Sequence, residues 1–155
     1  MARVDFHSQV GNKLQYCCRL VRKISTSTAE GEPLRRIVIL ADSGLLKELD
    51  RLLWTFSTED FLPHCYAEHE SAFLTPIVLA SQWDEALFAE LPHADVLIHL
   101  NQTFLENASS LAERFPRMIE VVSLEEQDLL AGRARYKRYR ELGFELQNYD
   151  QKGAS

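Results

Sequence analysis

The chain has 155 residues and a net charge of −6, from 17 Lys and Arg against 23 Asp and Glu. This length suits one domain with a single core. Its apolar runs, such as residues 37–41, are far too short to cross a membrane, and its first residues lack the apolar stretch of a secretory signal. We therefore expect a cytoplasmic protein without a membrane partner. The acidic balance argues against broad binding to nucleic acids.

Apolar periodicity predicts strands and helices that alternate along the chain. In chain order we expect a strand at Val4–Val10, a helix at 13–24, a strand at Arg36–Ala41, a helix from Asp42 or Ser43 to Trp54, an irregular stretch between Pro63 and Pro76, a strand at Ile77–Ala80, a helix at Trp83–Leu91, a strand at Asp95–Leu100, a helical turn at Ser109–Phe115, a strand at Met118–Val122, and a helix at Glu125–Leu142 that ends before Gly143. This alternation is typical of an α/β fold: a three-layer, Rossmann-like sandwich around a mostly parallel sheet. We expect one domain over residues 1–144. Residues 145–155 form a C-terminal tail, for which disorder is one alternative.

The sequence contains no G-x-G-x-x-G after the first strand, no G-x-x-x-x-G-K-[ST] and no G-x-S-x-G. Cys17 and Cys18 read as buried residues of the first helix. The best metal candidate, the cluster of His64, Cys65 and His69, lacks a second ligand pair at zinc spacing, so ordinary loop residues are favoured. His99 on a strand is more simply a core histidine than a base. We expect no cofactor, no metal and no catalysis. A small α/β nucleotide-binding protein or enzyme without a recognisable phosphate loop stays the alternative.

The last predicted helix concentrates positive charge, because five of the 17 Lys and Arg residues lie within 133–140. At about 100° per residue, one stripe of this helix carries Leu129, Arg133, Tyr136, Lys137 and Arg140. Another stripe, expected to face the sheet, carries Ala131, Tyr139 and Leu142. Three cations beside a ring and an alkyl group suit an acidic peptide that ends in an apolar residue. Composition alone favours a merely solvated face, and direct contact with DNA or RNA is a third interpretation that the overall charge opposes.

Two motifs resemble the chi subunit family of bacterial DNA polymerase III. Residues 135–144 read R-Y-K-R-Y-R-E-L-G-F, like the family's C-terminal signature, and residues 53–64 resemble its L-W-x6-F-x-P-H. Chain length and strand–helix order are also similar up to Phe144. The resemblance implies a non-enzymatic clamp-loader accessory with two partners. One is the psi subunit, and the other is the acidic, phenylalanine-terminated tail of the single-stranded-DNA-binding protein, so contact with DNA is indirect.

The resemblance places a pocket for this tail at Trp54, Phe61, Val122, Arg133, Tyr136, Lys137, Arg140 and Gly143. The first two residues form apolar walls with Val122 beneath, the three cations hold carboxylates, Tyr136 packs on the phenylalanine ring, and Gly143 permits a close backbone approach. Arg135 and Arg138 are not expected to bind. Relatives can carry a basic residue where this chain has Leu129, which predicts a lower affinity for the tail. The resemblance assigns no residue to psi.

Overall fold

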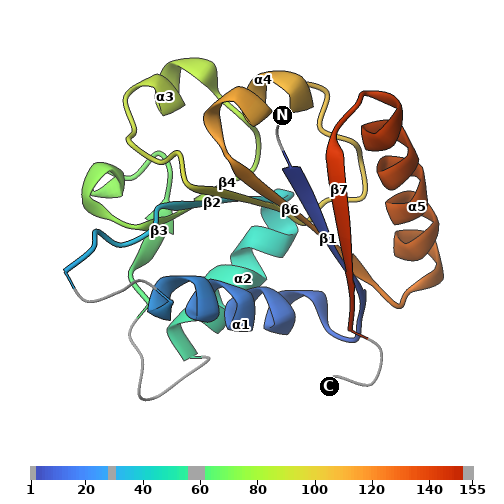
Figure 1. Cartoon of the computed structure of the whole chain (residues 1–155). Coiled ribbons are helices and arrows are strands. Elements are labelled where there is room, and N and C mark those ends of the chain that lie inside the picture. Colours follow the sequence, from blue (N-terminus) through green and yellow to red (C-terminus); the bar gives the residue numbers. More distant parts are fainter. Residues whose placement is uncertain (1–2, 28–30, 56–61, 152–155) are drawn as a thin grey trace.

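The structure is a computed structural model that describes residues 3–27, 31–55 and 62–151 (Figure 1). Within these ranges, seven parallel strands form one sheet in the order β3-β4-β2-β5-β6-β1-β7. The strands are β1 (Arg3–Val10), β2 (Ile37–Leu40), β3 (His64–Tyr66), β4 (Ile77–Ala80), β5 (Val96–His99), β6 (Arg117–Ser123) and β7 (Glu145–Asp150). The helices are α1 (Lys13–Thr26), α2 (Ser43–Thr55), α3 (Glu85–Ala89), α4 (Ala108–Arg114) and α5 (Glu126–Glu141), with a 3-10 turn η1 (Ala72–Leu74).

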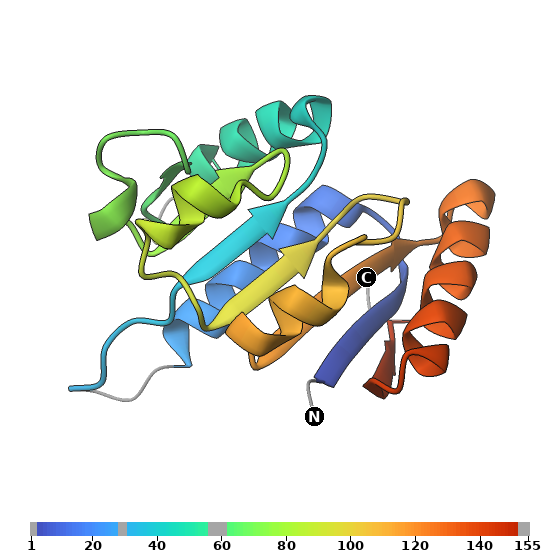
Figure 2. The same cartoon turned by 90° about the horizontal axis from the view of Figure 1, so that it is seen from above.

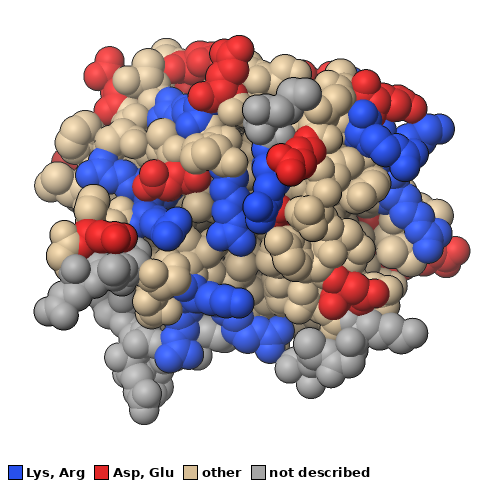
Figure 3. Space-filling view, viewed as in Figure 1, with Lys and Arg blue, Asp and Glu red and all other residues tan. Residues whose placement is uncertain are grey.

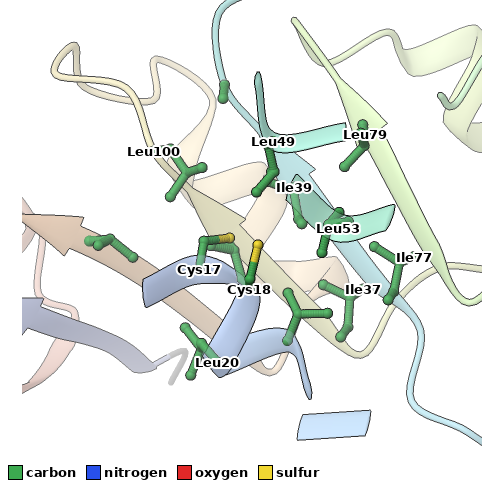
Figure 4. Packing of buried hydrophobic residues seen from close by; sticks show 14 of the residues in the cluster. Cys17, Cys18, Leu20, Ile37, Ile39, Leu49, Leu53, Ile77, Leu79 and Leu100 are labelled. Atoms are coloured by element: carbon green, nitrogen blue, oxygen red, sulfur yellow. The ribbon is translucent and has the colours of Figure 1, made fainter. Parts of the chain in front are cut away.

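Helices cover both faces of the sheet, which confirms the predicted three-layer α/β architecture (Figures 1 and 2). Helices α1 and α2 pack on one face, where Cys17 and Cys18 lie against strand residues such as Ile37 and Ile39 (Figure 4). Both thiols are buried, as predicted, and burial raises the pKa of Cys18 to about 11. Helices α3, α4 and α5 cover the other face. Among the described residues, no helix is both long and apolar enough to span a membrane.

Two strands lie where no strand was predicted. Residues Glu145–Asp150 form β7, which pairs in parallel with β1 over six successive residues at one edge of the sheet. The expectation of a tail that could be disordered is therefore wrong for 145–150, whereas 152–155 lie outside the described residues. At the other edge, the three-residue β3 pairs with β4 inside the stretch predicted to be irregular. Both strands are too polar or too short to show an apolar period.

The buried face of α5 also differs from the prediction. Tyr139 is fully buried as expected, but Leu142 is 51% exposed. The residues of α5 that are buried against the sheet are Asp128, Gly132, Arg135 and Tyr139. This stripe keeps the helical spacing of three and four but contains only one large apolar side chain. Because its other members are polar or small, apolar periodicity does not indicate that this face of α5 is buried.

Candidate functional site

A cavity of about 290 Å³ lies where α5 crosses strands β6, β1 and β7. Its lining residues are Phe6, Ser8, Gln9, Val122, Leu129, Gly132, Arg133, Tyr136 and Asn148. The structure therefore brings together three of the predicted site residues, Val122, Arg133 and Tyr136. The other lining residues come from strands β1 and β7 and from α5. Of these, only Leu129 was placed beside the site from sequence, as part of the cationic stripe of the last helix. We call this cavity the α5 pocket.

The close approach of α5 to β6 depends on Gly132. A Cβ atom placed at this position would lie 2.7 Å from both Cγ atoms of Val122. Any larger residue would thus overlap a buried, branched side chain of the sheet. Gly132 and Val122 together form the floor of the α5 pocket.

Aromatic packing fixes the ring of Tyr136 beside this floor. Its centroid lies 5.1 Å from that of Phe6 in an edge-to-face arrangement. Tyr136 is half-buried, so part of the ring still faces the cavity. At the rim, Gln9 has a φ of 56°, and the register of β1 with β6 shifts between His7 and Val10. Such a bulge turns a strand end aside, and here it brings the Gln9 side chain to the pocket.

The cations of α5 divide into three groups. Arg133, Lys137 and Arg140 are exposed and follow one another at spacings of four and three residues, and Arg133 lines the pocket. Arg138 lies 4.2 Å from the centroid of the Phe104 ring and 3.6 Å from a carboxylate oxygen of Glu106. The remaining cation, Arg135, is buried. Of the exposed cations of α5, Arg133 therefore lines the α5 pocket, whereas Lys137 and Arg140 lie further along the same helix and are not among its lining residues. We call these three residues the cationic rim.

A buried network around Glu120 holds α5 in place. Glu120 is 1% exposed and accepts hydrogen bonds from His99 Nδ1 at 2.9 Å, Arg135 Nε at 3.0 Å and the Tyr139 hydroxyl at 2.7 Å. Burial alone would raise the pKa of Glu120, but His99, Arg135 and the Tyr139 hydrogen bond outweigh it, and the pKa lies below its usual value. Arg135 Nη1 also donates to the carbonyl of Gln102 at 2.8 Å. The prediction of His99 as a core histidine is confirmed, and the network fixes the register of α5 on the sheet.

The other predicted site residues lie elsewhere. Trp54 lies in the last turn of α2, which packs near β3 and β4 on the face opposite α5, at the far end of the sheet. At this distance from α5 it cannot form the predicted wall. The prediction was wrong because the order of motifs along the chain does not give their positions across a sheet. Phe61 lies outside the described residues. Gly143 has a φ of 88° and donates its N–H to the Arg140 carbonyl at 3.1 Å, so its role is to end α5 and turn the chain into β7.

Trp54 borders a second surface, which we call the β3 edge. A cavity of about 420 Å³ is lined there by Asp50, Trp54, Pro63, His64, Cys65, Tyr66, His69, Ser71 and Thr75. The Trp54 ring packs on His64, with centroids 4.3 Å apart, yet Trp54 is 52% exposed. Large exposed apolar side chains follow nearby at Phe73 and Leu74. The β3 edge thus combines the outermost strand on this side of the sheet, as far as the described residues show, with exposed aromatic and aliphatic groups.

The histidines of this region already have hydrogen-bond partners. His64 Nδ1 contacts the Leu62 carbonyl at 2.7 Å and its Nε2 contacts Asp50 Oδ1 at 2.9 Å. His69 Nδ1 accepts the Ser71 backbone N–H at 3.0 Å. In the described part of the chain, no three His, Cys, Asp or Glu residues are grouped so that they could hold a metal ion.

Fold and site together define a Rossmann-like α/β protein whose last helix presents a tyrosine and a cationic rim over a small pocket. Residues 1–147 match the family model described as "DNA polymerase III chi subunit, HolC". The chain therefore belongs to the DNA polymerase III chi subunit family, which confirms the resemblance seen in its motifs. The DNA polymerase III subunit chi of Pseudomonas aeruginosa is 33% identical over 155 residues, covering 96% of each chain. That of Escherichia coli K12 is 29% identical over 112 residues, covering 72% of this chain and 71% of the relative.

Proposed function

We propose that this chain is a non-catalytic adaptor of the DNA polymerase III clamp loader that binds the acidic tail of the single-stranded-DNA-binding protein in the α5 pocket. The observation that carries the proposal is the position of Tyr136 and Arg133 over the floor made by Gly132 and Val122. An aromatic terminal side chain would enter the cavity and pack on Tyr136. Arg133 would take the terminal carboxylate, with Lys137 and Arg140 further along the rim for neighbouring aspartates.

The charge of the α5 pocket supports an anionic ligand. Its described lining residues include Arg133 but no Asp or Glu. Arg135 is excluded from binding because its charge is already committed to Glu120, and Arg138 is engaged with Phe104 and Glu106. Compared with the prediction from sequence, we keep the same three cations and Val122, and we propose Phe6 and Leu129 as apolar walls in place of Trp54.

Fluorescence anisotropy with a labelled acidic peptide that ends in phenylalanine tests this assignment. Arg133→Ala and Tyr136→Ala should each weaken binding by about 1–3 kcal/mol, or roughly 5- to 150-fold in Kd. Arg138→Ala is the matched control, since it removes the same charge from the same helix away from the pocket. Peptide with a terminal alanine should bind weakly to every variant. Equal affinities for the wild type, Arg133→Ala and Tyr136→Ala would contradict the assignment.

For the second partner, psi, we propose the β3 edge. A stable partner subunit needs exposed apolar area, and Trp54, Phe73 and Leu74 provide it beside β3, the last strand of the sheet on this side in the described part of the chain. Trp54→Ala or Leu74→Asp should abolish co-purification of psi and leave the affinity for the tail peptide unchanged. Loss of peptide affinity in Trp54→Ala would instead return this residue to the tail site.

The alternative of a nucleotide-binding enzyme gains no support from the carboxyl ends of the strands. A cavity of about 820 Å³ lies there, where parallel α/β sheets commonly bind ligands. Its cation, Lys13, already donates to the Leu100 carbonyl at 2.7 Å and to Asp128 at 3.0 Å. Asp42 and Glu125 also line this cavity, so its charge would repel a phosphate group.

A further inference from the structure

A separate cavity of about 410 Å³ lies on the opposite face of β1 from the α5 pocket. It is bordered by α1, β1, β6 and β7, and its lining residues are His7, Tyr16, Arg19, Leu20, Lys23, Ile24, Ser27, Arg117, Tyr149 and Gln151. The proposed adaptor function uses none of these side chains. We call this cavity the α1 pocket.

Positive charge gathers at the α1 pocket although the protein is acidic. Arg19, Lys23 and Arg117 line it, and its described lining contains no Asp or Glu. Arg117 contacts the buried carboxylate of Asp5 at 3.3 Å, but Asp5 is also bound by Arg3 at 2.7 Å, so one negative charge is shared between two cations. Figure 3 shows Lys and Arg side chains along α1 and above it, toward the start of β1. The site is therefore positive overall and suits an anion.

Aromatic rings stand beside these cations. Tyr16 belongs to α1 and Tyr149 to β7. Their ring centroids lie 5.6 and 5.2 Å from that of His7. Tyr149 is partly exposed, and the Arg19 guanidinium lies 5.8 Å from the Tyr16 ring centroid. Aromatic faces interleaved with cations are the usual means of holding a planar base next to a phosphate.

His7 adds an unsatisfied polar atom to the α1 pocket. It is 7% exposed, its Nδ1 is hydrogen-bonded to the Tyr16 hydroxyl, and its Nε2 is buried with no partner among the described residues. Burial, together with the charge of Arg117, lowers the pKa of His7 to about 4, so the ring is neutral at pH 7. Buried nitrogens are nearly always hydrogen-bonded in folded proteins. A polar ligand atom reaching this nitrogen would supply the missing partner.

We propose that the α1 pocket binds a nucleoside phosphate, either free or as one nucleotide of single-stranded DNA. The phosphate would lie among Arg19, Lys23 and Arg117, and the base would pack on the Tyr149 ring. This site is distinct from the α5 pocket, since alternate residues of β1 and β7 face the two cavities.

Titration of the full chain with fluorescein-labelled oligo(dT), and competition by dTMP, tests the proposal. Arg19→Glu with Lys23→Glu should weaken binding about tenfold or more, and rising salt should weaken binding to the wild type. Arg35→Glu with Lys47→Glu makes the same change in net charge at exposed positions outside the cavity and should have a much smaller effect. Tyr149→Ala should reduce affinity about fivefold or more through lost stacking, with circular dichroism confirming the fold.

The two ligand sources give different results. If dTMP binds as tightly as the oligonucleotide, the site takes a free nucleotide, whereas binding of the oligonucleotide alone identifies single-stranded DNA, and both results support the proposal. Arg133→Ala should leave this binding unchanged, so failure here and failure of the adaptor function are separable. Three results would overturn the proposal. Neither probe binds at low salt, or the control pair weakens binding as much as Arg19→Glu with Lys23→Glu does. The third is that Arg19→Glu with Lys23→Glu weakens binding of the acidic peptide and leaves the affinity for both probes unchanged.

Discussion

Gly132→Ala should destabilise the protein, although alanine is the better helix former. In a helix interior this replacement gains about 1 kcal/mol from intrinsic propensity. Here the new Cβ would lie 2.7 Å from both Cγ atoms of Val122, roughly 1 Å closer than an ordinary contact. Val122 is branched and buried in the sheet, so it cannot move aside, and overpacking of this kind costs about 1–3 kcal/mol. We expect the free energy of unfolding to fall by about 1 kcal/mol and the Tm to fall by about 2–4 °C.

A double-mutant cycle with Val122→Ala isolates this contact. Val122→Ala removes both Cγ atoms and leaves the Cβ of residue 122 at 3.3 Å from the new methyl group, a tight contact that a small shift relieves. Gly132→Ala in the Val122→Ala background should therefore recover most of the propensity gain and raise the free energy of unfolding by up to about 1 kcal/mol. Urea denaturation of the four proteins measures both free energies of unfolding. The reasoning is refuted if Gly132→Ala stabilises the wild type, or if it costs the same in both backgrounds.

Three further outcomes follow from buried and pocket-lining groups. Glu120→Gln should lower the free energy of unfolding, measured by urea titration, by roughly 3–5 kcal/mol, because Arg135 would be left with a buried, unpaired charge. As a control, Glu106→Gln at an exposed pair should change the same free energy by less than about 1 kcal/mol. Because the unfolded chain protonates His7 near pH 6.5 and the folded one only near pH 4, stability should fall as pH drops from about 6.5 to about 4, and His7→Asn should flatten that slope. Leu129→Lys should tighten binding of the acidic peptide roughly two- to fivefold by anisotropy, whereas Leu129→Gln should not; equal effects would exclude charge as the cause.

The central strands could be predicted from sequence because burial on both faces selects continuous apolar runs. Strand β2, Ile37–Leu40, is fully buried and was located within a residue or so of its ends. Strand β7 gives no such signal: Glu145–Asp150 is polar and mostly exposed, and it joins the sheet through backbone pairing with β1. A single sequence records side-chain burial, whereas an edge strand is specified mainly by the free hydrogen-bonding edge of its neighbour.

The candidate site was half predictable for a related reason. Helical periodicity correctly grouped Arg133 with Tyr136, because both depend only on the local geometry of α5. The buried position of Arg135 depends on Glu120, which lies on another element, and no spacing rule connects them. The predicted position of Trp54 is wrong for a similar reason. Its motif gives only its place along the chain, whereas the strand order places α2 at the far end of the sheet from α5. Gly132 carried a weak signal, since a glycine inside a helix usually has a packing reason.

Strand β7 gains its importance from the alternation of side chains along β1. Phe6 and Ser8 face the α5 pocket and His7 faces the α1 pocket, and β7 repeats the division with Asn148 and Tyr149. One polar edge strand therefore completes two cavities of different chemistry while contributing little to the core. Both proposed ligands, a peptide and a nucleoside phosphate, depend on the same backbone pairing with β1. Loss of residues from 145 onward would consequently remove both binding activities together, whereas the point variants at Arg133 and Tyr149 separate them.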